Sequence, residues 1–367
     1  MKMKKFAVLF LLLALLTSCF SSCGNKPNDE NTVPFVTETA ATAENNTEET
    51  SSGTKTETNA NPSDGESEKE TEKDVKSSER ETEKTTAPVV EPVMNTDGRR
   101  SFYGERDENA KTFTGLKSLP LNTFPSVRFE NTKNLSVKTI NHSFGVAKGG
   151  KPHQISVNNQ KFFDDGKYDA VCLDEKTTEK VLYLTFDCGY ENGYTAKILD
   201  TLRDKNVKAA FFCTMPEMAE NHDIIARMIN EGHTVGNHSV HHPDFSSLSR
   251  EKMYEEVKGF DDYIREHFGY SSLYFRYPQG KYSESSLDLL NSMGYKCVFW
   301  SLAYADWDLK AQKGGAYAKE TVVSRLHPGA VILLHAVSPD NAAALGDIID
   351  EAREQGYRFL SLDEMKS

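Results

Sequence analysis

An aspartate and a cysteine stand side by side at the end of an apolar stretch, in LYLTFDCGYENGY at residues 182–194. Asp187 has the chemistry of a general base, and Cys188 has that of a metal ligand when its thiol is ionised. A cysteine nucleophile is a weaker hypothesis, because the adjacent carboxylate disfavours the thiolate unless a metal is bound. The pair alone leaves open whether the carboxylate, the thiol, both or neither takes part in the chemistry.

A second group of reactive residues occurs in NHSVHHPD at residues 237–244. His238 and His242 are four residues apart, so one helical turn would place both imidazoles on one side. Two such imidazoles can bind a metal, and a catalytic zinc needs a third protein ligand, for which Asp187 and Cys188 are the candidates. A histidine-rich surface loop without a metal is the competing interpretation.

The elements that position these residues are regular from about residue 137 onward. Strands are predicted at residues 181–187, 209–214, 233–239, 273–278, 296–301, 330–336 and 357–362. Helices are predicted at residues 192–206, 219–232, 249–269, 283–294, 315–327 and 341–356. Alternating strands and helices indicate a parallel sheet covered by helices. No G-x-G-x-x-G fingerprint follows the first strand, so a barrel is favoured over an open dinucleotide-binding sheet.

The reactive residues share one kind of position on these elements. Each lies at the carboxyl end of a predicted strand or in the loop after it: Asp187 and Cys188, His238 and His242, Arg276, Asp306, and His335. The carboxyl ends of parallel strands meet at one face, where α/β barrels have their active sites. Five separate segments therefore predict one shared site.

The segment from about residue 140 to the end resembles the polysaccharide deacetylases, the NodB-like carbohydrate esterases of family 4. Five motifs appear in the family's order: TFDCG for TFDDG, HSVHH for H[ST]xxH, RYPQG for RxPxG, ADW, and LLH. Longer stretches, including LTFDCGYENGYT and VFWSLAYADW, resemble the branch that deacetylates N-acetylmuramic acid during delta-lactam formation. The resemblance implies a distorted (β/α)7 barrel and a metal-dependent hydrolase that cleaves a non-peptide amide.

The resemblance also implies a role for each matching residue. Asp187 matches the catalytic base, Arg276 the arginine that orients it, His335 the general acid, and Asp306 the partner of that histidine. His238 and His242 match the metal ligands, and the metal is expected to be zinc. Cys188 replaces the usual metal-binding aspartate, and whether its thiolate binds zinc is left open. Gln279 stands where the muramic branch often has arginine, which concerns substrate contacts.

Four aromatic residues near these motifs are candidates for binding sugar rings: Tyr190, Tyr194, Tyr304 and Trp307. Flat aromatic faces suit sugars, although such residues are as often part of the core.

The chain before residue 137 has a different composition. Lys2, Lys4 and Lys5 precede an apolar run at 6–16 that is too short to span a bilayer, and LTSC resembles a lipoprotein box ending at Cys19. Residues 1–18 are therefore predicted to be a lipoprotein signal peptide; an ordinary secretion signal is the alternative. Residues 24–95 carry 17 acidic and 7 basic residues with few apolar ones, so 19–95 is predicted to be a disordered tether.

Residues 96–136 are interpreted as an N-terminal extension and 137–367 as the deacetylase domain, with its catalytic core at about 180–365. The net charge of −12 over 367 residues argues against a nucleic-acid partner. The expected partners are instead a peptidoglycan strand and, through the lipid on Cys19, the outer face of the cell membrane. Two alternatives stay open: a deacetylase of N-acetylglucosamine or another polysaccharide, and a catalytically weak wall-binding lipoprotein. A role in sporulation follows only from the family branch.

Overall fold

The computed structural model describes residues 119, 121–124 and 127–365. The predicted signal peptide, the lipidation site Cys19 and the tether of residues 19–95 lie outside the described residues, as does most of the 96–136 extension. Among the helices that are described, none is both long enough and apolar enough to cross a membrane.

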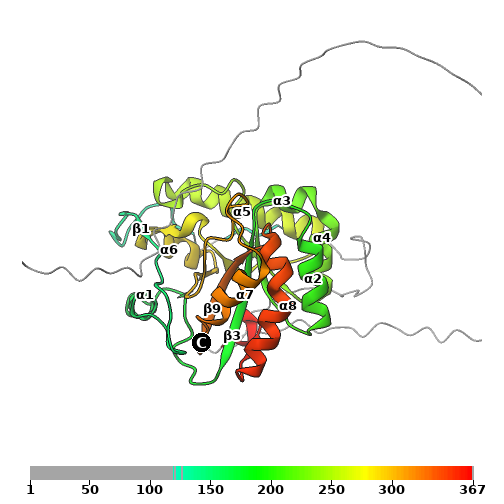
Figure 1. The fold of residues 1–367 in the computed structure, drawn as a ribbon. Coiled ribbons are helices and arrows are strands. Elements are labelled where there is room, and N and C mark those ends of the chain that lie inside the picture. The colour runs from blue at the N-terminus through cyan, green and yellow to red at the C-terminus, as the bar shows by residue number, and fades with distance from the viewer. Residues whose placement is uncertain (1–118, 120, 125–126, 366–367) are drawn as a thin grey trace, which may run out of the picture. The chain divides into compact units, whose positions relative to one another are not determined.

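A parallel sheet forms the centre of the described fold (Figure 1). Its strands are β2 (Ala170–Val171), β3 (Val181–Cys188), β4 (Ala210–Cys213), β5 (Thr234–Asn237), β6 (Tyr274–Phe275), β8 (Lys296–Val298), β9 (Ala330–His335) and β10 (Arg358–Leu360). The strand order is β10-β3-β4-β5-β6-β8-β2. The strand β9 is outside this order and also pairs with β3. Every pair within this sheet is parallel.

The sheet curls until its two ends approach each other. The chain just after β8 meets β9 through a parallel bridge between Leu302 and Ile332, and the Ser301 N–H donates to the Val331 carbonyl at 3.0 Å. The predicted α/β class and the parallel, curled sheet are therefore confirmed. The predicted seven-stranded barrel is closed only in part, because isolated bridges rather than a ladder join β8 to β9.

Helices follow most strands and cover the outside of the sheet (Figure 1). They are α2 (Thr195–Asp204), α3 (Met215–Glu220), α4 (His222–Asn230), α5 (Arg250–Phe268), α6 (Glu284–Ser292), α7 (Gly315–Val323) and α8 (Pro339–Glu354). Their ends follow local chemistry: the Ser249 side chain accepts from the Lys252 N–H at the start of α5, and Gly269 ends it with φ 57°. The six predicted helices are confirmed, and α3 is additional.

An N-terminal segment that the sequence did not assign to elements packs beside this unit. It contains β1 (Ile140–Asn141) and α1 (Gln154–Gly166), and β1 pairs antiparallel with β7 (Lys281–Tyr282). Phe163 of α1 stacks on Phe299 with ring centroids 5.1 Å apart. The segment is thus joined to the loop region beyond β6 and β8.

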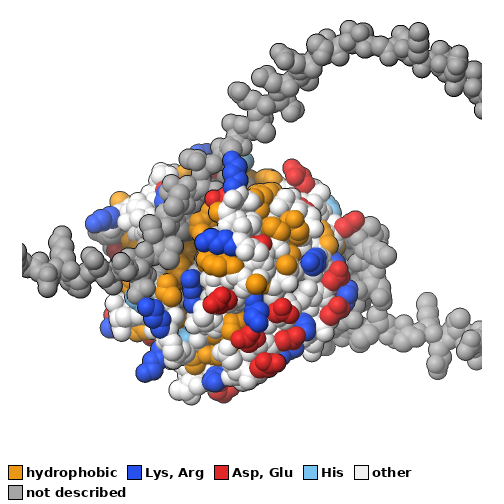
Figure 2. Space-filling view, in the orientation of Figure 1, with side chains coloured by type: hydrophobic (Ala, Val, Ile, Leu, Met, Phe, Trp, Pro, Cys, Tyr) orange, Lys and Arg blue, Asp and Glu red, His pale blue; other side chains and the backbone are white. Residues whose placement is uncertain are grey.

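Alternate residues of β3 face opposite sides of the sheet, as in any strand. Leu182, Leu184 and Phe186 belong to the apolar cluster shared with the covering helices, whereas Tyr183 belongs to a cluster on the inner side. The surface over α2, α7 and α8 carries interspersed acidic and basic side chains (Figure 2), including the Lys319–Glu351 pair at 2.7 Å. The alternation of side chains along β3 decides which of its residues face the site.

Candidate active site

The carboxylate of Asp187 is the centre of the site. Asp187 is in register with His335 across β3 and β9, so the two strand ends bring a carboxylate and an imidazole to the same edge. Its Oδ1 accepts a hydrogen bond from Arg276 at 2.7 Å, and its Oδ2 lies 3.6 Å from Nε2 of His238. Burial alone would raise the pKa of Asp187, but Arg276, His238 and His335 lower it below its ordinary value. Asp187 is therefore an ionised base at neutral pH.

The Arg276 guanidinium is fully buried and is bonded on every side. Besides Asp187 it donates to Thr185 Oγ1 at 2.9 Å, to the Val298 carbonyl at 3.0 Å and to the Phe299 carbonyl at 3.4 Å. Its carbon lies 4.1 Å from the centre of the Phe212 ring. This network compensates the cost of removing a charge from water and fixes the orientation of Asp187.

His335 and Asp306 form a second hydrogen-bonded pair of candidate catalytic residues. Nδ1 of His335 is 2.7 Å from Asp306 Oδ1, and the backbone N–H of His335 donates to Asp306 Oδ2 at 2.7 Å. A carboxylate only accepts, so Nδ1 carries the hydrogen and Nε2 points away from Asp306. Asp306 is buried, while 21% of the His335 side chain is exposed. The imidazole is thus held by Asp306 through Nδ1 and is partly exposed.

Asn341 belongs to this pair although the sequence did not single it out. Its amide donates to Asp306 Oδ2 at 2.5 Å and to the His335 carbonyl at 3.1 Å, and its Oδ1 accepts from the Tyr304 hydroxyl at 2.5 Å. It lies in the first turn of α8, where Ser338 caps its N–H. A polar residue following a Ser-Pro helix start just after a strand-end histidine was the available signal.

His238 and His242 are brought together by a loop rather than by the predicted helical turn. The loop turns sharply because Ser239 and His242 both adopt left-handed backbone conformations, with φ 73° and φ 56°. The Ser239 hydroxyl accepts from the His242 N–H at 2.9 Å, and Asn237 accepts from the Ser239 N–H at 2.8 Å. The two imidazole centres are 4.8 Å apart. The pairing was predicted correctly, whereas the helical geometry was wrong.

These two histidines have the protonation state that a metal requires. Nδ1 of His238 is 2.8 Å from the Arg276 carbonyl, which can only accept, so the lone pair is on Nε2. Burial lowers the pKa of His238, and it lowers that of His242 to about 3, so both are neutral. Two neutral imidazoles are suitable donors for a divalent metal. Among the described residues, no group of three or more His, Cys, Asp or Glu side chains is arranged to hold one.

Cys188, proposed from the sequence as a further zinc ligand, is not brought to the histidines. It follows Asp187 on the same strand and therefore faces the opposite side, where it joins the apolar cluster of Phe186 and Met218. Its thiol is hydrogen-bonded to Cys213, and this contact and burial raise its pKa. The thiol is therefore neutral, which is the wrong form for a metal ligand.

The four aromatic candidates have different positions. Trp307 meets the His335 ring edge-on at a centroid distance of 5.4 Å, and 48% of Tyr190 is exposed. Tyr194 packs against the core at the start of α2. Tyr304 is buried, with its hydroxyl on Asn341, so it supports the Asp306 network rather than offering a free face. Only Tyr190 and Trp307 retain the geometry of sugar platforms.

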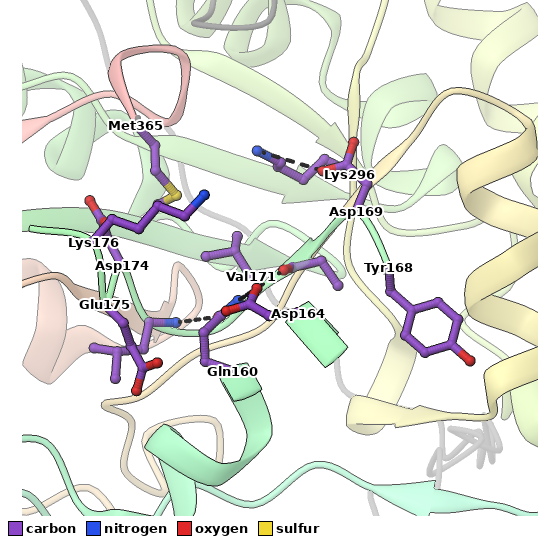
Figure 3. Close-up of a pocket in the computed structure, with 12 residues that line it drawn as sticks. Gln160, Asp164, Tyr168, Asp169, Val171, Asp174, Glu175, Lys176, Lys296 and Met365 are labelled. Carbon is purple, nitrogen blue, oxygen red and sulfur yellow. Dashed lines mark hydrogen bonds and ion pairs between the residues drawn. The ribbon is translucent and has the colours of Figure 1, made fainter. Parts of the chain in front are cut away.

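A pocket of about 160 Å³ lies elsewhere, near the amino ends of β2 and β8 (Figure 3). Asp169 and Lys296 line it, 3.6 Å apart, together with Gln160 and Asp164 from α1. None of the predicted site residues lines this pocket. The strand carboxyl ends remain the place where the reactive side chains converge.

Comparison with known proteins agrees with this arrangement. Residues 174–298 match the family model described as polysaccharide deacetylase. The chain is 46% identical over 200 residues to an uncharacterized 30.6 kDa protein of Geobacillus stearothermophilus, covering 54% of this chain and 75% of that one. The described fold resembles the solved structure of Bacillus subtilis PdaA, a family 4 carbohydrate esterase, with a TM-score of 0.60, 39% identity, and coverage of 63% of this chain and 98% of the other.

The chain therefore belongs to the polysaccharide deacetylase family. Among its relatives is the peptidoglycan-N-acetylmuramic acid deacetylase PdaA of Bacillus subtilis, with 44% identity over 200 residues. The alignment covers 54% of this chain and 76% of that protein.

Proposed function

We propose that this protein removes the acetyl group from N-acetylmuramic acid residues of peptidoglycan, in glycan that lacks stem peptides. The observation that carries the proposal is the buried arrangement in which Arg276 holds Asp187 and Asp306 holds His335 at adjacent strand ends. The 44% identity to the muramic acid deacetylase of Bacillus subtilis supports this sugar over N-acetylglucosamine.

The base in this reaction is Asp187. Its Oδ1 is tied to Arg276, so Oδ2 is the oxygen that can take a proton from the attacking water. The low pKa of Asp187 keeps that oxygen ionised before the reaction. Arg276 keeps the carboxyl group oriented and favours its return to the ionised form once the proton has been passed on.

The acid is His335. An amide nitrogen is a poor leaving group unless it is protonated, and Nε2 of His335 is the ring nitrogen that does not face Asp306. Asp306 stabilises the protonated ring through Nδ1, and Asn341 fixes Asp306 from the other side. This pair therefore presents a proton in a defined direction.

His238 and His242 would hold a divalent metal, for which zinc is our proposal. When bound, such an ion supplies Lewis-acid polarisation of the amide carbonyl and of a water molecule. Tyr190 and Trp307 would border the sugar at the open side of His335.

The test is acetate release by the purified protein from peptidoglycan stripped of stem peptides, with N-acetylglucosamine oligomers in parallel. We expect release from the stripped glycan, loss of release in Asp187→Asn, and little release from the oligomers. Release from the oligomers alone would assign the other sugar. No release from either substrate with added zinc would support a wall-binding role instead.

We further propose that residues 1–18 are a lipoprotein signal, that Cys19 carries a lipid, and that residues 19–95 tether the deacetylase domain of residues 137–367 to the outer face of the membrane. A substrate outside the cytoplasm and the LTSC motif support this arrangement. In cell fractionation, the wild-type chain should sediment with membranes and Cys19→Ala should not. Equal membrane association of both proteins would contradict the anchor.

A further inference from the structure

Two cysteines that the deacetylase reaction does not use face each other at the end of the sheet. Cys188 of β3 and Cys213 of β4 are direct partners in the parallel ladder. Partners in a parallel pair point to the same side, and both side chains belong to the same apolar cluster. Each thiol affects the pKa of the other, and the Cys213 thiol donates to the Phe211 carbonyl at 3.8 Å.

The backbone separation of such partners suits a covalent bond. Neighbouring strands are about 4.8 Å apart, and disulfides join residues whose Cα atoms are about 4.4–6.8 Å apart. The other two cysteines of the described residues do not have this relation. Cys172 lies just beyond β2, whereas Cys297 of β8 is in register with Ala170, two residues earlier. All four cysteines of the described residues are buried free thiols in this structure, and Cys172 and Cys297 form a natural internal control.

We propose that Cys188 and Cys213 form a structural disulfide when the protein folds outside the cytoplasm. The proposal rests on the extracytoplasmic location given under the proposed function, because disulfides persist in oxidising compartments. The oxidant is a disulfide, either that of a thiol–disulfide oxidoreductase or a small-molecule disulfide.

The chemistry balances without any group from the active site. One thiolate attacks a sulfur of the oxidant and releases one thiol, which leaves a mixed disulfide on the protein. The second cysteine thiolate then displaces the remaining thiol and closes the Cys188–Cys213 bond. The protein loses two protons and two electrons, and the oxidant is reduced to two thiols.

The surroundings indicate a structural bond rather than a reversible switch. Both sulfurs are buried, with Cys188 1% exposed and Cys213 fully enclosed. The carboxylate of Glu217 lies near both thiols and is among the causes that raise their pKa. The folded pair is therefore slow to exchange with external thiols, so the bond would form before the core closes.

The bond would fix the part of β3 that carries the catalytic base. Asp187 immediately precedes Cys188 and must stay in register with His335 on β9. A link from Cys188 to β4 prevents the end of β3 from separating from its neighbour. Cys188, which stands where the family usually has an aspartate, would then have a structural function on the side of the sheet that faces the helices.

The experiment is a thiol map of the full chain after folding with oxidised glutathione. The protein is denatured without reductant, alkylated with iodoacetamide, digested and analysed by mass spectrometry. We expect a linked pair of peptides containing Cys188 and Cys213, with Cys172 and Cys297 alkylated. Alkylation of all four cysteines would overturn the proposal, whether or not the protein deacetylates glycan.

Matched variants separate the bond from simple loss of a thiol. The wild-type protein is unfolded and refolded with dithiothreitol, which is removed before melting is measured. We expect its melting temperature to be about 5–10 °C lower than that of the oxidised protein. Cys213→Ala should show no such dependence on reductant, whereas Cys297→Ala should retain it. Equal melting temperatures of the oxidised and reduced wild-type protein would contradict a structural disulfide.

Discussion

Arg276 is a permanent charge in a place that water does not reach, and its partner is the proposed base. The guanidinium donates to Asp187, Thr185 and two strand-end carbonyls, so its position is determined by the fold. Asp187 in turn is kept ionised by this neighbour against the effect of its own burial. The two side chains are best regarded as one functional group, because removing either one would leave the charge of the other buried and uncompensated.

Replacing Arg276 with methionine tests this interdependence. The pKa of Asp187 is lowered in the native protein, so loss of the positive charge lets it rise, and the carboxyl is then protonated at a higher pH. We expect kcat/KM to fall at least about 100-fold and the acid limb of its pH profile to move to higher pH. A variant with an unchanged acid limb would show that Asp187 does not set it.

The Asp306→Asn variant tests the second pair. The amide keeps the shape of Asp306 but no longer carries the charge that stabilises a protonated His335. We expect kcat to fall by about 10²–10⁴-fold with a much smaller change in KM, measured as acetate release. Asn341→Asp, which adds a carboxylate beside Asp306, provides a comparison that alters the same network. Wild-type kcat in Asp306→Asn would contradict the acid role of His335.

At this scale the sequence identified side chains but not their directions. Asp187, Arg276, Asp306 and His335 were predictable because each stands at the carboxyl end of a strand or in the loop after it. Cys188 was assigned to the metal site although adjacent residues of a strand face opposite sides, a rule available from the sequence alone. Asn341 was missed because its role depends on how α8 begins against β9, which is a tertiary feature.

At the scale of the elements, side-chain packing between the central strands β4 and β5 affects the site directly. Gly236 of β5 is the ladder partner of Phe212 of β4, and an added Cβ would lie 2.4 Å from the Phe212 ring. The central carbon of the Arg276 guanidinium lies 4.1 Å from the centre of that ring. Adding one methyl group at Gly236 is therefore expected to displace Phe212. Phe212 would in turn displace Arg276, which holds the proposed base.

Gly236→Ala should consequently reduce both stability and activity. Overpacking of this kind costs about 1–3 kcal/mol, and displacement of Phe212 should lower kcat/KM in parallel. Gly346→Ala in α8 is the matched control, because its Cβ would meet only ordinary contacts at 3.7 Å. Urea unfolding and acetate release measure the two effects. Unchanged activity in a folded Gly236→Ala protein would show that the Phe212 contact is not needed.

The longer elements were predictable and the short ones were not. The helices α5, α6 and α8 have apolar faces, serine N-caps and a glycine at or just after their last residue, which define them locally. Strands of two residues, such as β2 and β6, are determined by pairing with distant neighbours. The loop around His238 was mistaken for a helical turn because two non-glycine residues adopt left-handed conformations there, which no local residue type announces.

For the molecule as a whole, the N-terminal segment proves to be part of the folded unit. His142, next to β1, is buried, and its Nε2 donates to the Trp300 carbonyl at 2.7 Å. Its ring lies 4.8 Å from that of Phe299, whose carbonyl accepts from Arg276. The region that matches the family model begins only at residue 174, so His142 lies before it.

This histidine makes stability depend on pH. Burial lowers the pKa of His142 from 6.5 to about 4. Between pH 4 and pH 6.5 the unfolded chain binds a proton at this histidine and the native protein does not. The free energy of unfolding therefore has its full value above pH 6.5 and decreases as the pH falls toward 4. The loss is on the order of 3 kcal/mol. His142→Gln keeps a donor without titrating, so its urea midpoint should fall less across this range. Parallel curves for both proteins would contradict this.

The central claim is that one site at the strand carboxyl ends deacetylates muramic acid, and the most direct test is to locate the lost acetyl group. Peptidoglycan stripped of stem peptides would be incubated with the protein or with Asp187→Asn, digested, and its sugars analysed by mass spectrometry. The account predicts that muramic acid residues lose the mass of one acetyl group only with the wild-type protein, while glucosamine residues keep theirs. Acetyl loss confined to glucosamine, or equal loss with Asp187→Asn, would contradict it.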